Sequence, residues 1–336
     1  MPESSREREH EARSRDRNGA RSVALLIALG TAVLAARGGA AQQRSLLDAP
    51  CTATAEAAVT EPQTGRTFLL DYPCDLQSDE SVLLILNLHG GGSSGTWQRR
   101  YFPAFDHKEQ YRLVIASPYS PPRRWSEEDD GYLRNIVTLL VDEIGQENVD
   151  AFWLVGHSQG GSTSRRLVCT PFFRDRVDGF LSLSGGRLGG AAPRSPQAGR
   201  PRQVGEPEPA STPAPAAPAP PEPACDFSHI FAIGEHEIES LPASSALAER
   251  FGCAGRVQRP DVVDDRPGYV HDGGRQNPGT PAWGLLPRPG RAEVYVYPDC
   301  RDGRVVADVV RIDKGHTEGL EPRVTEELVR LMRSAR

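Results

Sequence analysis

The stretch FWLVGHSQGG, residues 152–161, joins an apolar run to a helix-forming segment through the pattern Gly-x-Ser-x-Gly. An apolar run bounded by turn residues predicts a buried strand. In a tight turn between a buried strand and a helix, the serine takes a strained backbone conformation that exposes its hydroxyl, and the flanking glycines leave room for the turn. We therefore predict that Ser158 is a nucleophile. A serine that only caps a helix is the alternative interpretation.

The same alternation of apolar runs and helical spacing extends along most of the chain. Continuous apolar strands are typical of a sheet covered on both faces. Alternation of strands with helices predicts βαβ units. We therefore expect the α/β class, with a mostly parallel central sheet and helices on both faces. The predicted strands are 81–88, 112–116, 152–155, 179–183, 230–233 and 305–312, and the predicted helices are 131–144, 159–168 and 321–332.

Residues 1–41 have the pattern of an export signal. Residues 1–21 are charged and carry several arginines, and the apolar run 22–36 is too short to span a membrane comfortably. Small residues follow, so we expect cleavage near Ala40 or Ala41. An N-terminal anchor that stays uncleaved is the alternative. Beyond such an anchor, we expect no stable membrane contact.

The remainder, 45–336, is predicted to be one domain with an insertion at 191–224. The insertion is dense in Pro and Ala and almost lacks large apolar residues, which predicts a flexible, disordered segment. A second loop, 260–289, is rich in Gly and Pro but is a candidate for substrate contact, with an ordered surface loop as an equal alternative. Its side chains of interest are Tyr269, His271, Trp283 and Leu285.

Charge and cysteine content restrict the partners and the compartment. The net charge of -6 has no basic stripe, so nucleic acid is not an expected partner. All six cysteines follow the signal, and none forms a Cys-x-x-Cys motif. An even number of cysteines in an exported chain predicts three disulfides and a periplasmic or extracellular location. The count alone does not choose among the pairings.

A serine nucleophile needs a base, and His316 is the best candidate among the histidines that follow Ser158. It lies in a loop after the predicted strand 305–312 and before the last helix, where an imidazole can reach the end of a neighbouring strand. A surface histidine is the alternative. His157, next to the nucleophile, is interpreted as packing. The other histidines after the serine are His229, His236 and His271.

An acid that orients the base is expected after strand 230–233, where the chain reads Gly-Glu-His-Glu. Both Glu235 and Glu237 fit this position. A metal site at 235–239 is a weaker alternative, because no second group of ligands has a matching spacing. No metal or cofactor is predicted.

The oxyanion of an acyl-transfer intermediate requires backbone N–H donors. One is expected from Gln159, the residue after the nucleophile. The other is expected from the loop LHGGGSSG at 88–95, whose glycines let the backbone approach a substrate closely. Gly91 is the preferred donor and Gly92 the next. A phosphate-binding loop is disfavoured because no lysine follows.

With these motifs in place, the chain resembles the polyhydroxybutyrate depolymerase and feruloyl esterase group of secreted α/β-hydrolases. The resemblance covers roughly residues 65–335 outside the insertion. It implies the α/β-hydrolase fold and hydrolysis of a small or polymer-derived ester, of short-chain acyl, feruloyl, acetyl or hydroxyalkanoate type. The matching pieces are LHGGGSSG at 88–95, DDGYLRNIVTLLVDEI at 129–144, VGHSQGG at 155–161, LSLSGG at 181–186, YPDCRDG at 297–303 and GHT at 315–317.

The resemblance also implies roles for particular residues. Its Gly-x-x-acid spacing places the acid at Glu237, where the family usually has Asp, and completes a triad with Ser158 and His316. A Trp-Pro pair often follows the family's histidine, and Thr317 and Glu318 stand there in this chain. The implied disulfides are Cys253–Cys300 and Cys169–Cys225, which leaves Cys51–Cys74 as the N-terminal pair.

The leading hypothesis is therefore a serine carboxylesterase that works through an acyl-enzyme intermediate. A peptidase or an acyltransferase with the same triad is a second hypothesis. A third is a catalytically decayed hydrolase scaffold that acts as a binding protein of the cell envelope.

Overall fold

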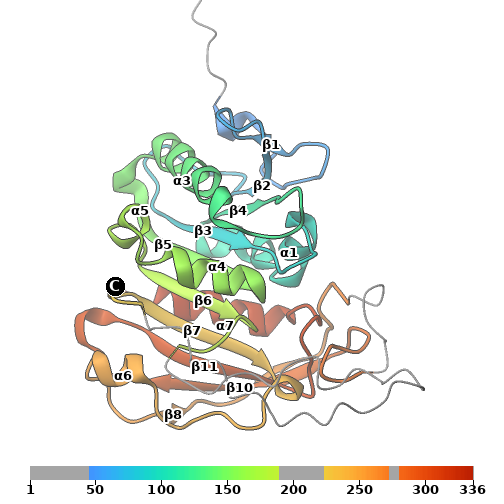
Figure 1. Ribbon diagram of the computed structural model, residues 1–336, viewed down its shortest axis with the longest axis vertical. Helices are drawn as coiled ribbons and strands as arrows, with labels where there is room; N and C mark the ends of the chain where they lie inside the picture. The colour runs from blue at the N-terminus through green and yellow to red at the C-terminus, as the bar shows by residue number, and fades with distance from the viewer. Residues whose placement is uncertain (1–44, 189–222, 272–279, 336) are drawn as a thin grey trace, which may run out of the picture. The chain divides into compact units, whose positions relative to one another are not determined.

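The computed structural model describes residues 45–188, 223–271 and 280–335, which belong to one compact unit (Figure 1). The predicted export signal 1–41 lies outside the described residues, and so does nearly all of the predicted insertion 191–224. No helix in the described part of the chain is long and apolar enough to cross a membrane.

The central feature is an 11-stranded sheet with the strand order β1-β2-β4-β3-β5-β6-β7-β11-β10-β8, in which β9 also pairs with β10. The six strands from β4 to β11 in this order are parallel, and the outer pairings are antiparallel. The strands are β1 Val59–Thr60, β2 Thr67–Asp71, β3 Val82–Leu88, β4 Leu113–Pro118, β5 Val149–His157, β6 Gly179–Leu183, β7 Ser228–Gly234, β8 Val257–Gln258, β9 Val262–Asp264, β10 Gly290–Tyr297 and β11 Val306–Ile312.

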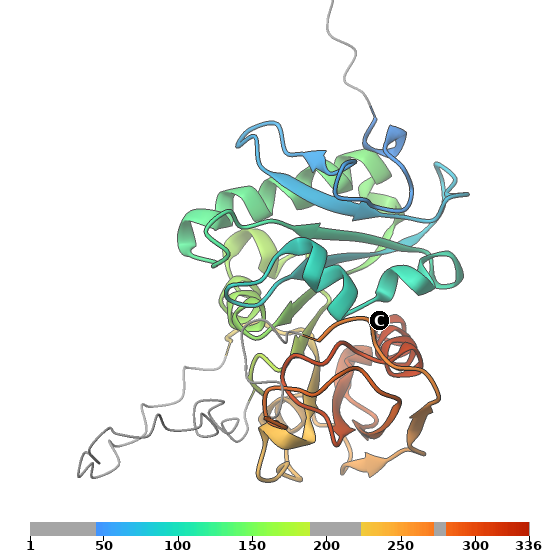
Figure 2. The same cartoon turned by 90° about the vertical axis from the view of Figure 1, so that its right-hand side faces the viewer.

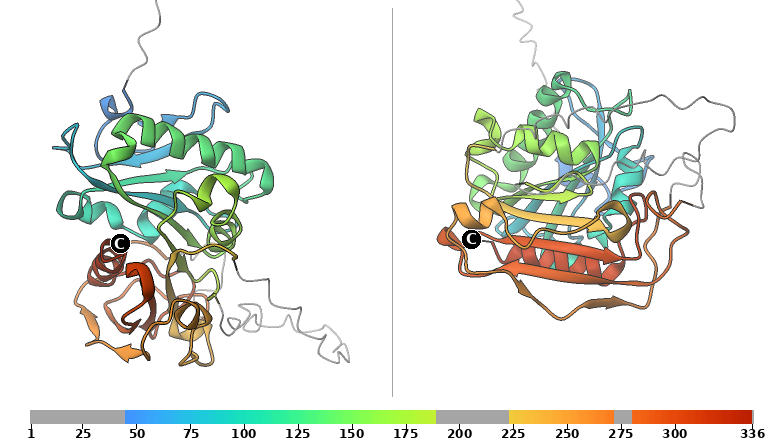
Figure 3. Two further views of the ribbon diagram at one scale, coloured as in Figure 1. Left: turned by 90° about the vertical axis from the view of Figure 1, so that its left-hand side faces the viewer. Right: turned by 60° about the horizontal axis from the view of Figure 1, so that its bottom comes forward.

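Helices cover both faces of this sheet, with α3 on one side and α7 on the other (Figures 1 and 2). The short strands β8 and β9 pair with β10 on the side away from β11 and form this edge of the sheet (Figure 3). The helices are α1 Gly95–Tyr101, α2 Lys108–Tyr111, α3 Asp130–Ile144, α4 Gln159–Leu167, α5 Pro171–Arg174, α6 Ala246–Arg250 and α7 Pro322–Arg333.

The apolar pattern of β3 explains why it is central. All seven residues from Val82 to Leu88 are buried, and alternate side chains enter the two cores on opposite faces of the sheet. Leu84 and Leu86 pack in the core that contains α3, whereas Leu83 and Ile85 pack in the core that contains α7. Such a strand can be covered only in a three-layer arrangement. The predicted α/β-hydrolase fold class, with its mostly parallel sheet, is therefore confirmed.

The predicted central strands and the three predicted helices are present, with shifted ends. The largest difference is β5, which begins at Val149 instead of residue 152 because Val149 and Ala151 still pair with β3. The predicted insertion falls between β6 and β7, which are neighbours in the sheet. The loop 260–289 contains the short strand β9, which the sequence analysis missed.

Three disulfides join segments that are distant in sequence: Cys51–Cys74, Cys169–Cys225 and Cys253–Cys300. These are the same pairs that the family resemblance implied. The second bond links the segment between α4 and α5 to the residues just before β7, on either side of the insertion. Each bond restricts the unfolded chain and so stabilises the folded state by about 3–4 kcal/mol in the chain-entropy model.

His229 is a buried histidine of the core. It lies on β7 with 2% of its surface exposed, and its Nδ1–H donates to the carbonyl oxygen of Phe180 at 3.1 Å. Burial lowers the pKa of His229 to about 3, so the ring is neutral at pH 7. The unfolded chain takes up this proton near pH 6.5. Stability from His229 is therefore present above pH 6.5 and is lost as the pH falls towards 3.

We expect His229→Phe to flatten the dependence of stability on pH. Each pH unit between 6.5 and 3 costs the wild type about 1.4 kcal/mol through this one residue, or about 2 kcal/mol by pH 5. Urea unfolding of both proteins at pH 7, 6 and 5 measures the difference. If the free energy of unfolding changed equally with pH in the two proteins, the result would contradict a neutral, buried His229.

Candidate active site

Ser158 stands at a sharp turn between β5 and α4. Its φ of 52° and ψ of -116° lie outside the regions that side-chain-bearing residues favour. Its N–H donates to the carbonyl oxygen of Leu183 at the end of β6, at 2.9 Å, which holds the turn against the sheet. Such local strain is typical of functional sites. The helix α4 begins at the next residue, Gln159, and directs its N-terminal partial positive charge towards the turn.

Close backbone contacts require the glycines of the turn. A Cβ on Gly156 would lie 2.2 Å from the carbonyl carbon of Gly160, and a Cβ on Gly160 would lie 2.2 Å from the carbonyl oxygen of Leu88. Both distances are far below any real contact. The spacing of glycines around Ser158 is thus a packing requirement, and the second contact places α4 directly on the end of β3.

His316 lies in the loop after β11 and contacts Glu237. Its Nδ1 is 2.5 Å from the Glu237 carboxylate, and the two residues are 7% and 3% exposed. Because a carboxylate accepts, Nδ1 carries the proton, and the neutral ring then has its lone pair on Nε2. That is the tautomer that a general base needs.

Glu237 is fixed in a one-turn 3-10 helix, Glu235–Glu237, that follows β7. Its second carboxylate oxygen accepts from the backbone N–H of Gly234 at 2.9 Å and from the Ser184 hydroxyl at 2.8 Å. A carboxylate held by three donors cannot rotate away from the imidazole. Ser184 was not a predicted site residue; its position just after a buried strand, β6, was the only signal for it.

The competing residue, Glu235, is exposed and does not contact His316. Its carboxylate accepts from the backbone N–H of Asp313 at 2.8 Å. His236 also contacts Asp313, with Nε2 2.7 Å from the carboxylate. Hydrogen bonds from Arg288 and then from His236 lower the pKa of Asp313 to about 2. These contacts tie the acid-bearing turn to the start of the histidine loop.

The glycine loop after β3 lies against the nucleophile turn. A Cβ on Gly90 would be 3.3 Å from the Cβ of Ser158, and a Cβ on Gly91 would be 3.2 Å from Oε1 of Gln159. The two predicted oxyanion donors, Gly91 and Gln159, therefore come from adjacent segments of backbone. Gln159 also accepts from the N–H of Trp125 at 3.3 Å, which fixes its side chain.

His89 holds the peptide between Gly90 and Gly91. Because the N–H of Ser120 donates to its Nε2 at 3.2 Å, its Nδ1 carries the proton and donates to the carbonyl oxygen of Gly90 at 2.8 Å. Burial lowers the pKa of His89 to about 4, so this donor is fixed and uncharged at neutral pH. A planar trans peptide directs its N–H opposite to its carbonyl. The orientation of the Gly91 N–H therefore follows from the His89 ring.

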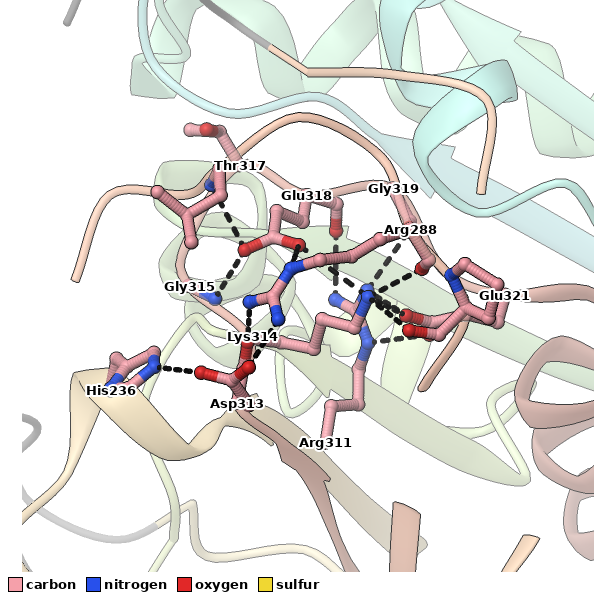
Figure 4. A network of polar contacts seen from close by, with 12 residues as sticks. His236, Arg288, Arg311, Asp313, Lys314, Gly315, Thr317, Glu318, Gly319 and Glu321 are labelled. Atoms are coloured by element: carbon pink, nitrogen blue, oxygen red, sulfur yellow. Dashed lines mark hydrogen bonds and ion pairs between the residues drawn. The ribbon is translucent and has the colours of Figure 1, made fainter. Parts of the chain in front are cut away.

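The loop that carries His316 stands on a buried network of charged residues (Figure 4). The Arg311 guanidinium donates to the Glu321 carboxylate at 3.0 and 3.2 Å and to the carbonyl oxygens of Glu318 and Gly319, both at 2.8 Å. Burial alone would favour neutral groups, but the opposite charges outweigh it. They raise the pKa of Arg311 and lower that of Glu321. At most 2% of each of the four charged residues is exposed: Arg311, Lys314, Glu318 and Glu321.

Glu318 connects this network to the residue before His316. One of its carboxylate oxygens accepts from the N–H of Gly315 at 3.2 Å and from the N–H of Leu285 at 3.0 Å. Lys314 extends the network to the same segment, because its Nζ donates to the carbonyl oxygen of Arg288 at 2.6 Å. The loop that carries His316 is thereby attached to residues 280–289, the last part of the loop 260–289.

That segment also supplies an aromatic neighbour. Trp283 meets the His316 ring edge-on with centroids 5.2 Å apart. The N–H of His316 donates to the carbonyl oxygen of Ala282 at 3.0 Å. Of the four side chains proposed for substrate contact, Trp283 is therefore the one that contacts a predicted site residue. Tyr269 is 57% exposed and donates instead to Asp106 at 2.8 Å.

His157 does more than the packing predicted for it. Its ring lies near those of Trp97 and Tyr101, as packing requires, but its Nε2 is also 2.9 Å from the carbonyl oxygen of His316. Nothing local in the sequence indicates this contact, because the two residues are 159 positions apart. Within the described ranges, no group of three or more His, Cys, Asp or Glu residues could hold a metal ion.

The strand order and this nucleophile turn together define the α/β-hydrolase class. No family model matches the chain, and no curated protein matches it. The chain is similar in structure to an acetyl xylan esterase from Aspergillus awamori, at 13% identity over 83% of this chain and 98% of that one, with a TM-score of 0.47.

Two further similar structures are serine-hydrolase and esterase structures. A fluorophosphonate-binding serine hydrolase of Staphylococcus aureus is 17% identical over 38% of this chain and 55% of that one, with a TM-score of 0.29. Thermogutta terrifontis esterase 2, phosphorylated by paraoxon, is 12% identical over 55% and 70%, with a TM-score of 0.35. None of these likenesses decides the chemistry of the site.

We expect Glu237→Gln to lower the kcat for p-nitrophenyl acetate by roughly 10³–10⁴-fold, because the amide can no longer stabilise the tautomer and the cation of His316. Glu235→Gln is the matched control, because Glu235 lies two residues away in the same 3-10 turn. Its kcat should stay close to that of the wild type. Steady-state kinetics of the two variants decide the acid. Equal losses, or a loss confined to Glu235→Gln, would refute the assignment of Glu237.

Proposed function

We propose that this chain is a serine esterase that hydrolyses carboxylic esters through an acyl-enzyme intermediate. The observation that carries the proposal is the 2.5 Å contact between Glu237 and His316, made at the same edge of the sheet as Ser158, which follows β5. A buried carboxylate, an imidazole in the base tautomer and a strained serine form the set of groups that acyl transfer requires.

In the proposed mechanism, Oγ of Ser158 attacks the ester carbonyl carbon while Nε2 of His316 takes the hydroxyl proton. Glu237 stabilises the imidazolium that forms. The N–H groups of Gln159 and Gly91 stabilise the tetrahedral oxyanion. Collapse expels the alcohol, which receives the proton from His316, and leaves the acyl group on the serine. A water molecule, deprotonated by the same imidazole, then releases the acid and restores the serine.

The proposed substrate is a small or polymer-derived ester. The resemblance to polyhydroxybutyrate depolymerases and feruloyl esterases supports short acyl, acetyl, feruloyl or hydroxyalkanoate groups. Trp283, partly buried beside His316, offers an apolar surface next to the base. The net charge of -6 argues against nucleic acid as a partner. No cofactor enters the mechanism.

Export of the protein is part of the proposal. Three disulfides fit an oxidising compartment, and residues 1–41 have the composition of a signal. We propose that the protein works in the periplasm or outside the cell.

We expect Ser158→Ala to lower turnover of p-nitrophenyl acetate by at least ~10³-fold, because the acyl-enzyme can no longer form. Far-UV and near-UV circular dichroism should match the wild type. A panel of acetyl, butyryl, feruloyl and hydroxybutyryl esters, with matching amides and acceptor alcohols, then separates an esterase from a peptidase or an acyltransferase. Full activity in the variant refutes the nucleophile, and a folded wild type that hydrolyses nothing favours a binding protein.

A further inference from the structure

His157 has a position that no part of the proposed mechanism uses. It is the residue before Ser158, it is 3% exposed, and its ring lies among three others. The ring centroids are 4.1 Å from Tyr101, 4.7 Å from His316 and 5.1 Å from Trp97. An aromatic hydrocarbon would fill such a place without the cost of burying polar nitrogen atoms. The nitrogens therefore need a separate explanation.

The Nε2 of His157 forms a hydrogen bond with the backbone of His316. Its carbonyl oxygen can only accept, so Nε2 of His157 carries the proton and donates to it at 2.9 Å. The hydroxyl of Tyr101, which is 1% exposed, donates to the same oxygen at 3.2 Å. Two buried donors from different elements, the end of β5 and the end of α1, thus converge on one backbone atom of His316.

The other nitrogen, Nδ1, has no hydrogen-bond partner among the described residues. Gly90 closes over it, because a Cβ there would lie 2.7 Å from Nδ1. A buried acceptor without a partner costs about 1–3 kcal/mol. A histidine is therefore less favourable here than a hydrocarbon ring of similar size. Packing alone does not explain it, whereas the hydrogen bond from Nε2 to His316 does.

These bonds complete the attachment of His316 to the rest of the protein. Its N–H donates to Ala282, its carbonyl oxygen accepts from His157 and Tyr101, and its Nδ1 donates to Glu237. The bond from His157 differs from the others, because its donor is covalently joined to the nucleophile. It links the side chain of His157, the residue before Ser158, to the backbone of His316 across 159 positions of sequence.

The His157 ring is held in its neutral form beside His316. Burial, and then the electrostatic interaction with His316, lower the pKa of His157 well below its usual value. Arg311 and His89 also lower the pKa of His157. A neutral His157 adds no second cation beside the imidazolium that forms at His316 during turnover.

We propose that His157, assisted by Tyr101, is a positioning residue that sets the place of the catalytic base relative to the nucleophile. The inference rests on the proposed function, since it assigns His157 to the triad of Ser158 and His316. Displacement of a catalytic group by about 1 Å can cost about 10²-fold in rate, so loss of the single bond from the His157 side chain to the His316 backbone should have a measurable effect.

The test compares three substitutions. His157→Phe keeps the ring and removes the donor, His157→Gln has an amide nitrogen that can reach the position of Nε2, and Tyr101→Phe removes the second donor. We expect kcat for p-nitrophenyl acetate to fall about 10-fold or more in His157→Phe with KM unchanged, because the base is displaced. His157→Gln should recover most of this loss, and Tyr101→Phe should lose less than His157→Phe.

His229→Phe is the matched control. His229 is also buried, lies on β7 two strands away from β5, and donates one ring N–H to a backbone carbonyl. The same substitution there should alter stability and leave kcat within about 2-fold of wild type, since surface and core changes away from a site act mainly on folding. Wild-type kcat in His157→Phe, no recovery in His157→Gln, or an equal loss in His229→Phe overturns the proposal.

A second readout does not depend on ester turnover. The proton between Nδ1 of His316 and Glu237 should give a proton resonance far downfield in the wild type and in His229→Phe. In His157→Phe we expect it to shift or broaden, because the His316 backbone is no longer held. An unchanged resonance overturns the proposal even if the wild type hydrolyses no ester. Absence of hydrolysis in the wild type, with a shifted resonance in His157→Phe, instead refutes only the proposed function.

Discussion

Parallel pairing of β3, β5, β6, β7 and β11 brings the carboxyl ends of five strands to one edge of the sheet, and every group of the site depends on that constraint. The glycine loop proposed to hold the oxyanion follows β3, Ser158 follows β5, Glu237 follows β7 and His316 follows β11. Ligand sites of open α/β sheets lie at this edge for the same reason. Residues 79 positions apart in the chain, Glu237 and His316, meet at 2.5 Å because their strands are neighbours in the sheet.

Sequence patterns could predict the parts of this arrangement that are local. The spacing of glycines around Ser158 is set by contacts within one turn, and the six apolar residues of β3 indicate a strand covered on both faces. The position of His316 was predictable because a loop between a late strand and the last helix has a defined place at the edge of the sheet. The choice between Glu235 and Glu237 was open from the residues alone, since both lie in the same 3-10 turn. The direction in which that turn leaves β7 brings Glu237 to His316 and Glu235 to the N–H of Asp313.

What the sequence could not predict are contacts between segments that only the sheet brings together. Ser184 binds Glu237 from the end of β6, and His157 binds the carbonyl oxygen of His316; neither contact leaves a periodic pattern. The buried charges around Arg311 are equally hidden, because isolated Arg and Glu residues normally indicate an exposed surface. Such groups are stable only when every partner is present. Together they hold in place the loop that carries His316.

The central claim is that Ser158 is the activated nucleophile of this edge. Treatment of the wild type with paraoxon, followed by intact-mass measurement and peptide mapping, tests it most directly. The account predicts one diethylphosphoryl group per chain, located on Ser158, and none on the folded Ser158→Ala variant. A wild type that stays unmodified, or a phosphoryl group located on another residue, would contradict it.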